Sequence, residues 1–193
     1  MSNIFSFNAI ESNSFNEFGE HLYDILKPIL DSNRNIIFLC IGSDKSTGDS
    51  LGPLVGCNIN NFDNDSIYIY GSLYSPVHSQ NLVNTLEDIK NSFENPYIVA
   101  IDASLGSFQN VGKVFIEDTP LLPGLALDKK LPAVGDLSIT GVVNISGDSK
   151  FMVLQTTRLY TVFTLAEFIS KGISYSIDKL IGKNLFIESL SDY

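Results

Sequence analysis

The sequence has few basic residues and no long apolar run, and each shortage excludes a class of function. Its 193 residues contain 12 Lys and Arg against 22 Asp and Glu, so the formal net charge is −10. Nucleic acids and anionic membrane surfaces are bound through clusters of Lys and Arg, and this balance argues against both as partners. The longest apolar runs have the length of a β-strand, far short of the roughly 20 residues that span a bilayer.

Cysteines are also few, since the chain contains only Cys40 and Cys57. The pair forms no CxxC or metal-binding pattern, so we expect two reduced, small core residues in a cytoplasmic protein. The N-terminus has no basic segment followed by an apolar core, so the sequence predicts no signal peptide.

Apolar strands alternate with amphipathic helices along the chain. Because 44% of the residues are hydrophobic, the chain can bury a sizeable core, and we expect one domain over residues 1–193 with a flexible leader at 1–12. Nearly continuous apolar strands separated by helices are typical of a mostly parallel sheet covered on both faces. The sequence therefore predicts a three-layer α/β/α fold in which the first three strands have the central order 2-1-3. The expected helices cover 13–30, 51–61, 77–93, 151–173 and 174–182, and the expected strands cover 35–42, 65–71, 95–103, 111–118 and 137–144, with a long proline-containing loop at 118–136.

A loop rich in Gly, Ser, Thr and Asp follows the first strand. It does not match a Walker-type phosphate cradle, because Gly42 and Gly48 are separated by five residues and Asp49 follows where Lys is required. An Asp at the start of a helix takes the place that a phosphate would occupy, and the helix dipole favours its ionised form. On this loop alone, Asp49 is either a helix cap or a functional carboxylate.

A second carboxylate, Asp102, ends the otherwise apolar third strand. Such a carboxylate is costly to bury without a partner, so it is usually paired or functional. In the order 2-1-3 the carboxyl ends of the first and third strands flank one crevice, which predicts that Asp49 and Asp102 face each other. Two close carboxylates cannot both ionise easily; we expect Asp102 to have the raised pKa and the pair to act as general acid and base on a water molecule.

Three further residues of the loop are candidate binding residues. Asp44 competes with Asp49 as the functional carboxylate, and Ser46 and Thr47 can donate hydrogen bonds nearby.

Two later residues are also candidate binding residues. His78 either polarises a substrate or caps and packs at its helix start, and Arg158 either neutralises a carboxylate or extends its stem to water. Because neither His21 nor His78 lies in a recognisable triad, a Ser or Cys nucleophile is not expected.

Several ordered motifs span roughly residues 34–175: GSDKSTGDSLGPLVG, YGSLYSPVHSQNL, AIDASLG, LLPGLALDKKLPAVGDLSITGVVN and VLQTTRLY. Together they resemble the YyaC-like sporulation proteins of spore-forming bacteria. That family is similar to the germination protease, which degrades small acid-soluble spore proteins, and more distantly to the endopeptidases that mature nickel–iron hydrogenases. The resemblance implies a cytoplasmic protein of the mother cell or forespore.

The germination protease carries two aspartates proposed to be catalytic, one in a T-x-D-x-L-G-P-type loop and one in an I-D-A strand end. Those motifs match residues 47–53 and 101–103 here, so the resemblance selects Asp49 and Asp102. It implies an aspartate-dependent endopeptidase acting on a protein or peptide substrate, such as spore proteins. The alternative is a non-catalytic relative that binds a peptide or protein partner in the same crevice. Either function is compatible with a homo-oligomer.

A metal is not expected. The hydrogenase endopeptidases surround nickel with a first-loop carboxylate, an acid at the end of strand two and a later His. Here the second strand ends at Gly71 and no His follows His78. We therefore expect neither a metal nor another cofactor.

Overall fold

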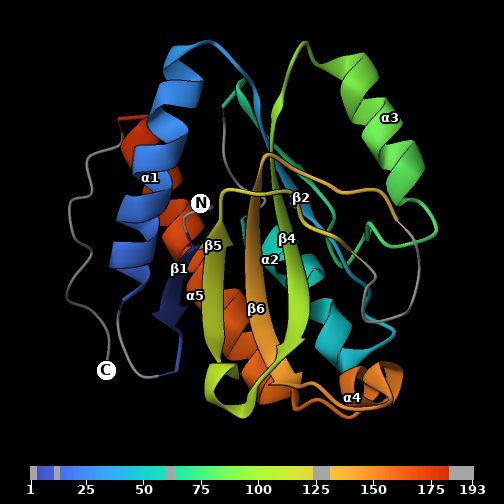
Figure 1. Cartoon of the computed structure of the whole chain (residues 1–193). Helices are drawn as coiled ribbons and strands as arrows, with labels where there is room; N and C mark the ends of the chain where they lie inside the picture. Colours follow the sequence, from blue (N-terminus) through green and yellow to red (C-terminus); the bar gives the residue numbers. More distant parts are fainter. Residues whose placement is uncertain (1–3, 11–13, 60–63, 124–130, 183–193) are drawn as a thin grey trace.

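A mixed six-stranded sheet forms the centre of the fold, with the strand order β1-β5-β6-β4-β2-β3 (Figure 1). The computed structural model describes residues 4–10, 14–59, 64–123 and 131–182. The elements are β1 (Ile4–Asn8), α1 (Phe15–Asp31), β2 (Ile36–Cys40), the 3-10 turn η1 (Thr47–Ser50), α2 (Leu51–Asn58), β3 (Ile67–Tyr70), α3 (Leu82–Ser92), β4 (Tyr97–Gly106), the 3-10 turn η2 (Phe108–Asn110), β5 (Lys113–Glu117), β6 (Leu137–Ile145), α4 (Lys150–Gln155) and α5 (Leu159–Leu180).

The central strands have the predicted order. The first three expected strands are β2, β3 and β4, and β2 pairs in parallel with both of the others. On the far side of β4, β6 is also parallel, whereas β5 is antiparallel to β6. The sheet is therefore mostly parallel, as predicted, and the order 2-1-3 is confirmed.

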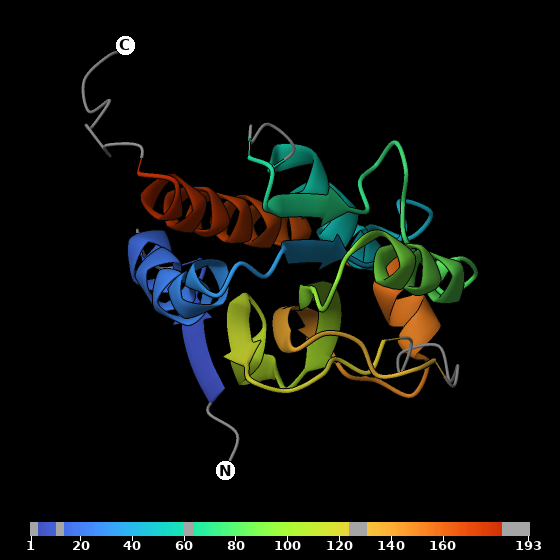
Figure 2. The ribbon, with the colours of Figure 1, turned by 90° about the horizontal axis from the view of Figure 1, so that it is seen from above.

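Helices cover both faces of the sheet, which confirms the α/β/α prediction. Alternate residues of β2 enter two separate clusters: Phe38 packs with the helices α1, α2 and α5, and Leu39 packs with α3. Seen from above, α2 and α5 lie on one side of the sheet and the chain leading into β6 lies on the other (Figure 2). Among the described residues, α3 is the one helix of this second layer, where residues of the 118–136 segment add to the cover.

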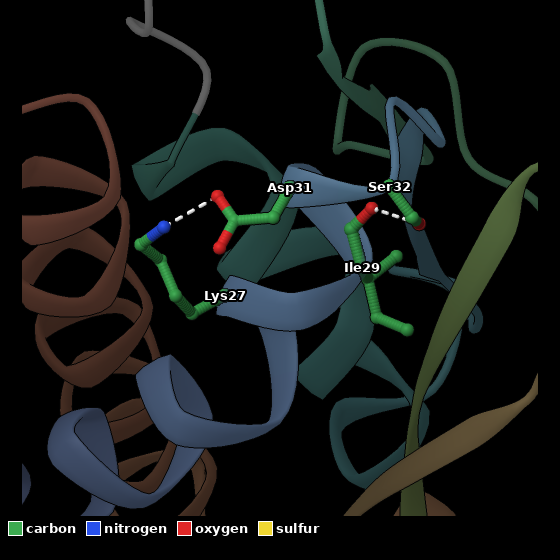
Figure 3. A network of polar contacts seen from close by, with 4 residues as sticks. All are labelled: Lys27, Ile29, Asp31 and Ser32. Carbon is green, nitrogen blue, oxygen red and sulfur yellow. Dashed lines mark hydrogen bonds and ion pairs between the residues drawn. The ribbon is translucent and has the colours of Figure 1, made fainter.

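Polar contacts close the end of α1 before the chain enters β2 (Figure 3). Lys27 forms an ion pair with Asp31 one turn later, and the hydroxyl of Ser32 donates a hydrogen bond of 2.7 Å to the carbonyl of Ile29. Asn33 then takes a left-handed conformation with φ of 58°, a turn that Asn tolerates well. The backbone N–H groups of Ser32 and Asn33 donate to the carbonyls of Pro28 and Leu30, which the end of the helix would otherwise leave unpaired.

The N-terminal residues correct one expectation. Ile4–Asn8 do not belong to a flexible leader but form β1, which pairs antiparallel with β5. Phe7 anchors the strand with an edge-on contact to Phe18 of α1, their ring centroids 5.4 Å apart. Because β1 is a short edge strand whose partners lie far along the chain, its local sequence gives a weak signal.

The expected helix at 151–173 is also wrong, because the chain forms two helices, α4 and α5, there. The hydroxyls of Thr156 and Thr157 donate to the carbonyls of Met152 and Val153, at 2.8 and 2.7 Å, and so end α4. Arg158 is extended, with ψ of 127°, and precedes α5. The helix expected at 174–182 is the continuation of α5. The break leaves α4 beside β6 and η1.

The cysteines are both free, but they differ in burial. Cys40 is fully buried on β2, and burial raises the pKa of its thiol. Cys57 is only partly buried, contrary to the expectation of a core residue, because it lies near the end of α2, where its sulfur accepts a hydrogen bond from the backbone of Leu73. Within the described parts of the chain, no helix is long and apolar enough to cross a bilayer.

Candidate active site

The loop after β2 folds back tightly and places Asp49 beside the end of the sheet. Gly42 has φ of +142°, and its N–H donates to the carbonyl of Val77 at 2.8 Å. The N–H of Ser43 donates to the carbonyl of Asp49 at 2.9 Å, which closes the loop. A Cβ on Gly42 would lie 2.1 Å from that same carbonyl oxygen, so only glycine fits there.

Asp49 lies within η1 and is the N-cap of neither helix that starts nearby. Ser46 is the N-cap of η1 and Ser50 is the N-cap of α2. The side chain of Asp49 is partly exposed and still benefits from the positive helix end that follows it.

Asp102 lies on β4, one residue beyond the point where β2 ends. The register pairs Cys40 with Ile101 on one side and Thr140 with Asp102 on the other. Only 9% of Asp102 is exposed, and its Oδ1 accepts a hydrogen bond of 2.7 Å from the N–H of Ala103. Because side chains alternate along a strand, Asp102 points to the same face as Ala100, the face covered by α3.

The electrostatics of the pair are asymmetric. Burial, followed by the negative charge of Asp49, raises the pKa of Asp102 well above its usual value, and the Ala103 N–H opposes the shift only in part. This confirms the expectation that Asp102 has the raised pKa. Asp102 thus retains a proton more readily than an ordinary carboxyl does.

Both aspartates line one cleft at the carboxyl end of the parallel strands. The cleft is open to solvent and encloses about 840 Å³ including the space at its mouth. Its walls come from the loop after β2, the start of α3 and the helix α4, with Pro123 and Leu131 on either side of a segment outside the described residues. That segment, 124–130, includes much of the predicted long loop.

Of the five candidate binding residues, Ser46 and His78 line this cleft. Asp44 is exposed and lies outside the lining, as does Thr47, whose carbonyl accepts a 2.7 Å hydrogen bond from the Ser50 hydroxyl. Arg158 is exposed at the start of α5 and is not in the lining either, which agrees with its structural alternative.

His78 has the structural role that its sequence position left open, and it also lines the cleft. Its backbone N–H donates to the side chain of Asn81 at 2.8 Å, and its carbonyl accepts from the N–H groups of Asn81 and Leu82, so it forms the turn that leads into α3. Its ring lines the cleft, and Nδ1 accepts a hydrogen bond of 3.3 Å from Gln80. In the neutral ring the proton is then on Nε2, which leaves a donor.

The helix α4 is the part of the site that the sequence prediction missed. Phe151, Leu154 and Gln155 form one wall of the cleft, and Gln155 donates to the carbonyl of Lys45 at 3.3 Å across the opening. The signal that could have shown this wall is the pair Thr156–Thr157, because adjacent β-branched residues that bond back to the helix favour its end.

Within the described residues, no group of three or more His, Cys, Asp or Glu side chains is placed to hold a metal ion. The site is therefore built from two carboxylates, an imidazole and an apolar wall. Such a pair can hold a proton on one oxygen and accept one on another, which is the requirement for general acid and base chemistry.

The fold and the site define an α/β domain with a carboxylate pair at the topological switch point of its sheet. A family model described as "Protein of unknown function (DUF1256)" matches residues 6–172, and the chain belongs to this family. It is 44% identical to the uncharacterized protein YyaC of Bacillus subtilis (strain 168) over 143 residues, which are 74% of this chain and 70% of the Bacillus protein. Among solved structures, a [NiFe] hydrogenase maturation protease, HycI from Thermococcus kodakarensis KOD1, matches with a TM-score of 0.46 and 16% identity, over 80% of this chain and 99% of the other.

Proposed function

We propose that this protein is a sporulation-associated endopeptidase that hydrolyses a protein or peptide substrate with Asp49 and Asp102. The observation that carries the proposal is the shared cleft: a buried carboxyl with a raised pKa and a second carboxyl line the same opening. The motifs that resemble the sporulation family and the germination protease support the cellular setting, the cytoplasm of the mother cell or forespore. Spore proteins are the first substrates to test.

In the proposed reaction the two carboxyls have different roles. The carboxylate of Asp49 accepts a proton from a water molecule while the water oxygen attacks the carbonyl carbon of the peptide bond. Protonated Asp102 donates its proton to the carbonyl oxygen, which forms a neutral tetrahedral diol. The C–N bond then breaks: the proton held by Asp49 passes to the leaving nitrogen and the diol returns a proton to Asp102. The pair is thereby restored.

The alternative is a non-catalytic relative that binds a peptide or protein partner in the same cleft. It is supported by the exposure of Phe151, which is 54% exposed at the cleft wall and does not depend on catalysis. Exposed apolar surface beside a cleft is typical of a binding site as well as of a substrate site.

Incubation with spore proteins and unfolded protein substrates separates these functions. New N-termini identified by mass spectrometry in the wild-type reaction, and their absence with Asp102→Asn and with Asp49→Asn, would support the peptidase. Asp44→Asn is the matched control, because this exposed loop carboxylate lies outside the cleft lining. Cleavage that persists in both Asp49→Asn and Asp102→Asn would reject the aspartate mechanism, whereas binding without any cleavage would favour the alternative.

A further inference from the structure

The cleft continues beyond the aspartate pair into a second hollow. Asp49, Asp102 and Leu154 line both hollows, so the two meet at the carboxyls. The first, here named the α4 arm, includes the apolar residues Ile41, Leu131, Phe151 and Leu154. The second, the β6 arm, runs along the sheet and has a mixed lining, in which hydroxyl groups lie beside leucines: Ser104, Thr119, Ser138, Thr140, Leu105, Leu121 and Leu122.

This arrangement favours a polypeptide that passes through the site over one that ends there. A terminal residue needs room on only one side of the reacting bond, whereas here the hollow extends to both sides of Asp102. In the β6 arm, Thr140 is the cross-strand partner of Asp102, so a hydroxyl group lies next to the carboxyl on the same face.

The α4 arm offers an apolar anchor that is held in place before any ligand binds. Leu154 is 3% exposed and packs beneath the wall to which Phe151 contributes. Gln155 donates to the carbonyl of Lys45, and the amide of Asn144 donates to Thr157 at 3.2 Å, so α4 is fastened at both the loop and the sheet. A rigid apolar wall gains affinity by removing apolar surface from water at little cost in ordering.

From these observations we infer that the site selects an extended internal segment of polypeptide whose large apolar side chain occupies the α4 arm against Phe151, Leu131 and Leu154. The inference rests on the proposed function, because it places that side chain beside the peptide bond that faces Asp49 and Asp102. The residues on the other side of the bond lie in the β6 arm.

The test measures binding separately from hydrolysis. Full-length Asp102→Asn protein is titrated with fluorescent peptides that have blocked ends and differ only at one guest position, with Phe, Leu, Ser, Asp or Lys. Fluorescence anisotropy should show Phe and Leu guests binding at least about ten-fold tighter than the polar guests, the discrimination expected of an apolar pocket. Blocked and unblocked ends should bind alike, because no terminus is read.

Two neighbouring residues provide a matched pair of variants for this assay. Phe151→Asp, in the Asp102→Asn background, should abolish the preference for apolar guests. Met152→Asp should keep it, because Met152 is 55% exposed, as Phe151 is at 54%, but does not line the cleft. Both side chains are at the surface, and circular dichroism verifies that each variant is folded.

Each outcome decides one of the two proposals. Equal affinity for all guests, a need for a free terminus, no binding at all, or an equal loss in both variants would overturn the apolar-anchor inference. Selective binding with no hydrolysis by the wild type would overturn the proposed peptidase and leave the inference standing. Hydrolysis without a preference for apolar residues would overturn the apolar-anchor inference and leave the proposed peptidase standing.

Discussion

Leu154 of α4 packs directly on the backbone of Gly48, in the loop that carries Asp49. A Cβ built on Gly48 would lie 2.8 Å from the Cδ2 of Leu154 and 2.9 Å from its Cα and its carbonyl oxygen. Such distances leave no room for a side chain, because the atoms in the way are backbone atoms of a helix as well as one methyl group. The contact ties the apolar wall to the position of the first carboxylate.

The first prediction concerns this contact. Gly48→Ala should push α4 away from η1 and lower the free energy of unfolding by about 1–3 kcal/mol, as added methyl groups in packed sites do. It should also weaken the binding of apolar peptides to the Asp102→Asn protein. Urea unfolding and the anisotropy assay measure the two effects.

Gly147→Ala is the control for Gly48→Ala. A Cβ there would meet only a side-chain methyl of Val153, at 3.3 Å, and that side chain can shift. Gly147→Ala should change the free energy of unfolding by no more than about 0.5 kcal/mol, as substitutions at most surface sites do. An equal loss of unfolding free energy in the two variants would show that the close contact with Leu154 is not the reason why Gly48 is needed.

A second prediction concerns the break between α4 and α5. Thr157 is 5% exposed; its hydroxyl donates to Val153 and accepts from the Asn144 amide. Thr157→Val keeps the shape but removes both hydrogen bonds. The Val153 carbonyl and the Asn144 amide then retain only longer bonds, of 3.4 Å from Thr156 and of 3.5 Å between each other, so the free energy of unfolding should fall by about 1 kcal/mol. Hydrogen exchange should become faster in α4, because the helix loses its attachment to β6.

Thr164→Val tests whether the loss is specific to this position. The hydroxyl of Thr164 makes a similar bond of 2.8 Å, to the carbonyl of Tyr160, but on α5 and closer to solvent. We expect a smaller loss of stability and no change in the exchange of α4. Unchanged exchange in Thr157→Val would contradict the role assigned to the threonine.

The central strands could be predicted from the sequence because β2 and β4 are apolar nearly throughout. Short apolar runs of this kind are typical of parallel strands that are buried on both faces of a sheet. The parallel order of β2 and β4 then placed Asp102 and the loop that carries Asp49 at the same edge of the sheet. The strand β1 and the break before α5 could not be predicted in the same way. The strand β1 depends on contacts with Phe18 and β5, and the break before α5 depends on a hydrogen bond from Asn144. Local sequence patterns do not contain information about these partners.

The same limit applies to the site residues. Asp102 follows from a strand end and Asp49 from the polar loop after a strand, and a sequence shows both directly. The cleft wall formed by Phe151 and Leu154 depends on how α4 turns back over the loop, and a single helical pattern concealed it. Arg158 had a functional and a structural alternative because it interrupts an apolar stretch, and the same break places it at the surface.

A third prediction separates the two causes that raise the pKa of Asp102. Burial is the larger cause and the charge of Asp49 is the second. Asp49→Asn should therefore lower the pKa of Asp102 but leave it above the usual value of about 3.9. Carboxyl ¹³C NMR titration measures this directly. An unchanged pKa would show that the two groups do not interact, and a return to the ordinary value would show that burial is not the main cause.

The last prediction concerns the stability and activity of Asp102→Asn. Because the pKa of Asp102 is raised in the folded state, the folded protein binds more protons than the unfolded chain between the ordinary and the raised pKa. The stabilising effect of neutral Asp102 is complete below the ordinary value of about 3.9 and is lost as the pH rises through the folded pKa. Asp102→Asn removes this loss, so the stability of the variant relative to the wild type should increase with pH. The proposed hydrolytic activity should disappear, since an amide cannot exchange the proton. Urea unfolding of both proteins from acidic to alkaline pH, with Asp44→Asn as the exposed control, tests the sign. A variant that becomes less stable than the wild type as the pH rises would mean that ionised Asp102 has a stabilising partner and is not the proton donor of the pair.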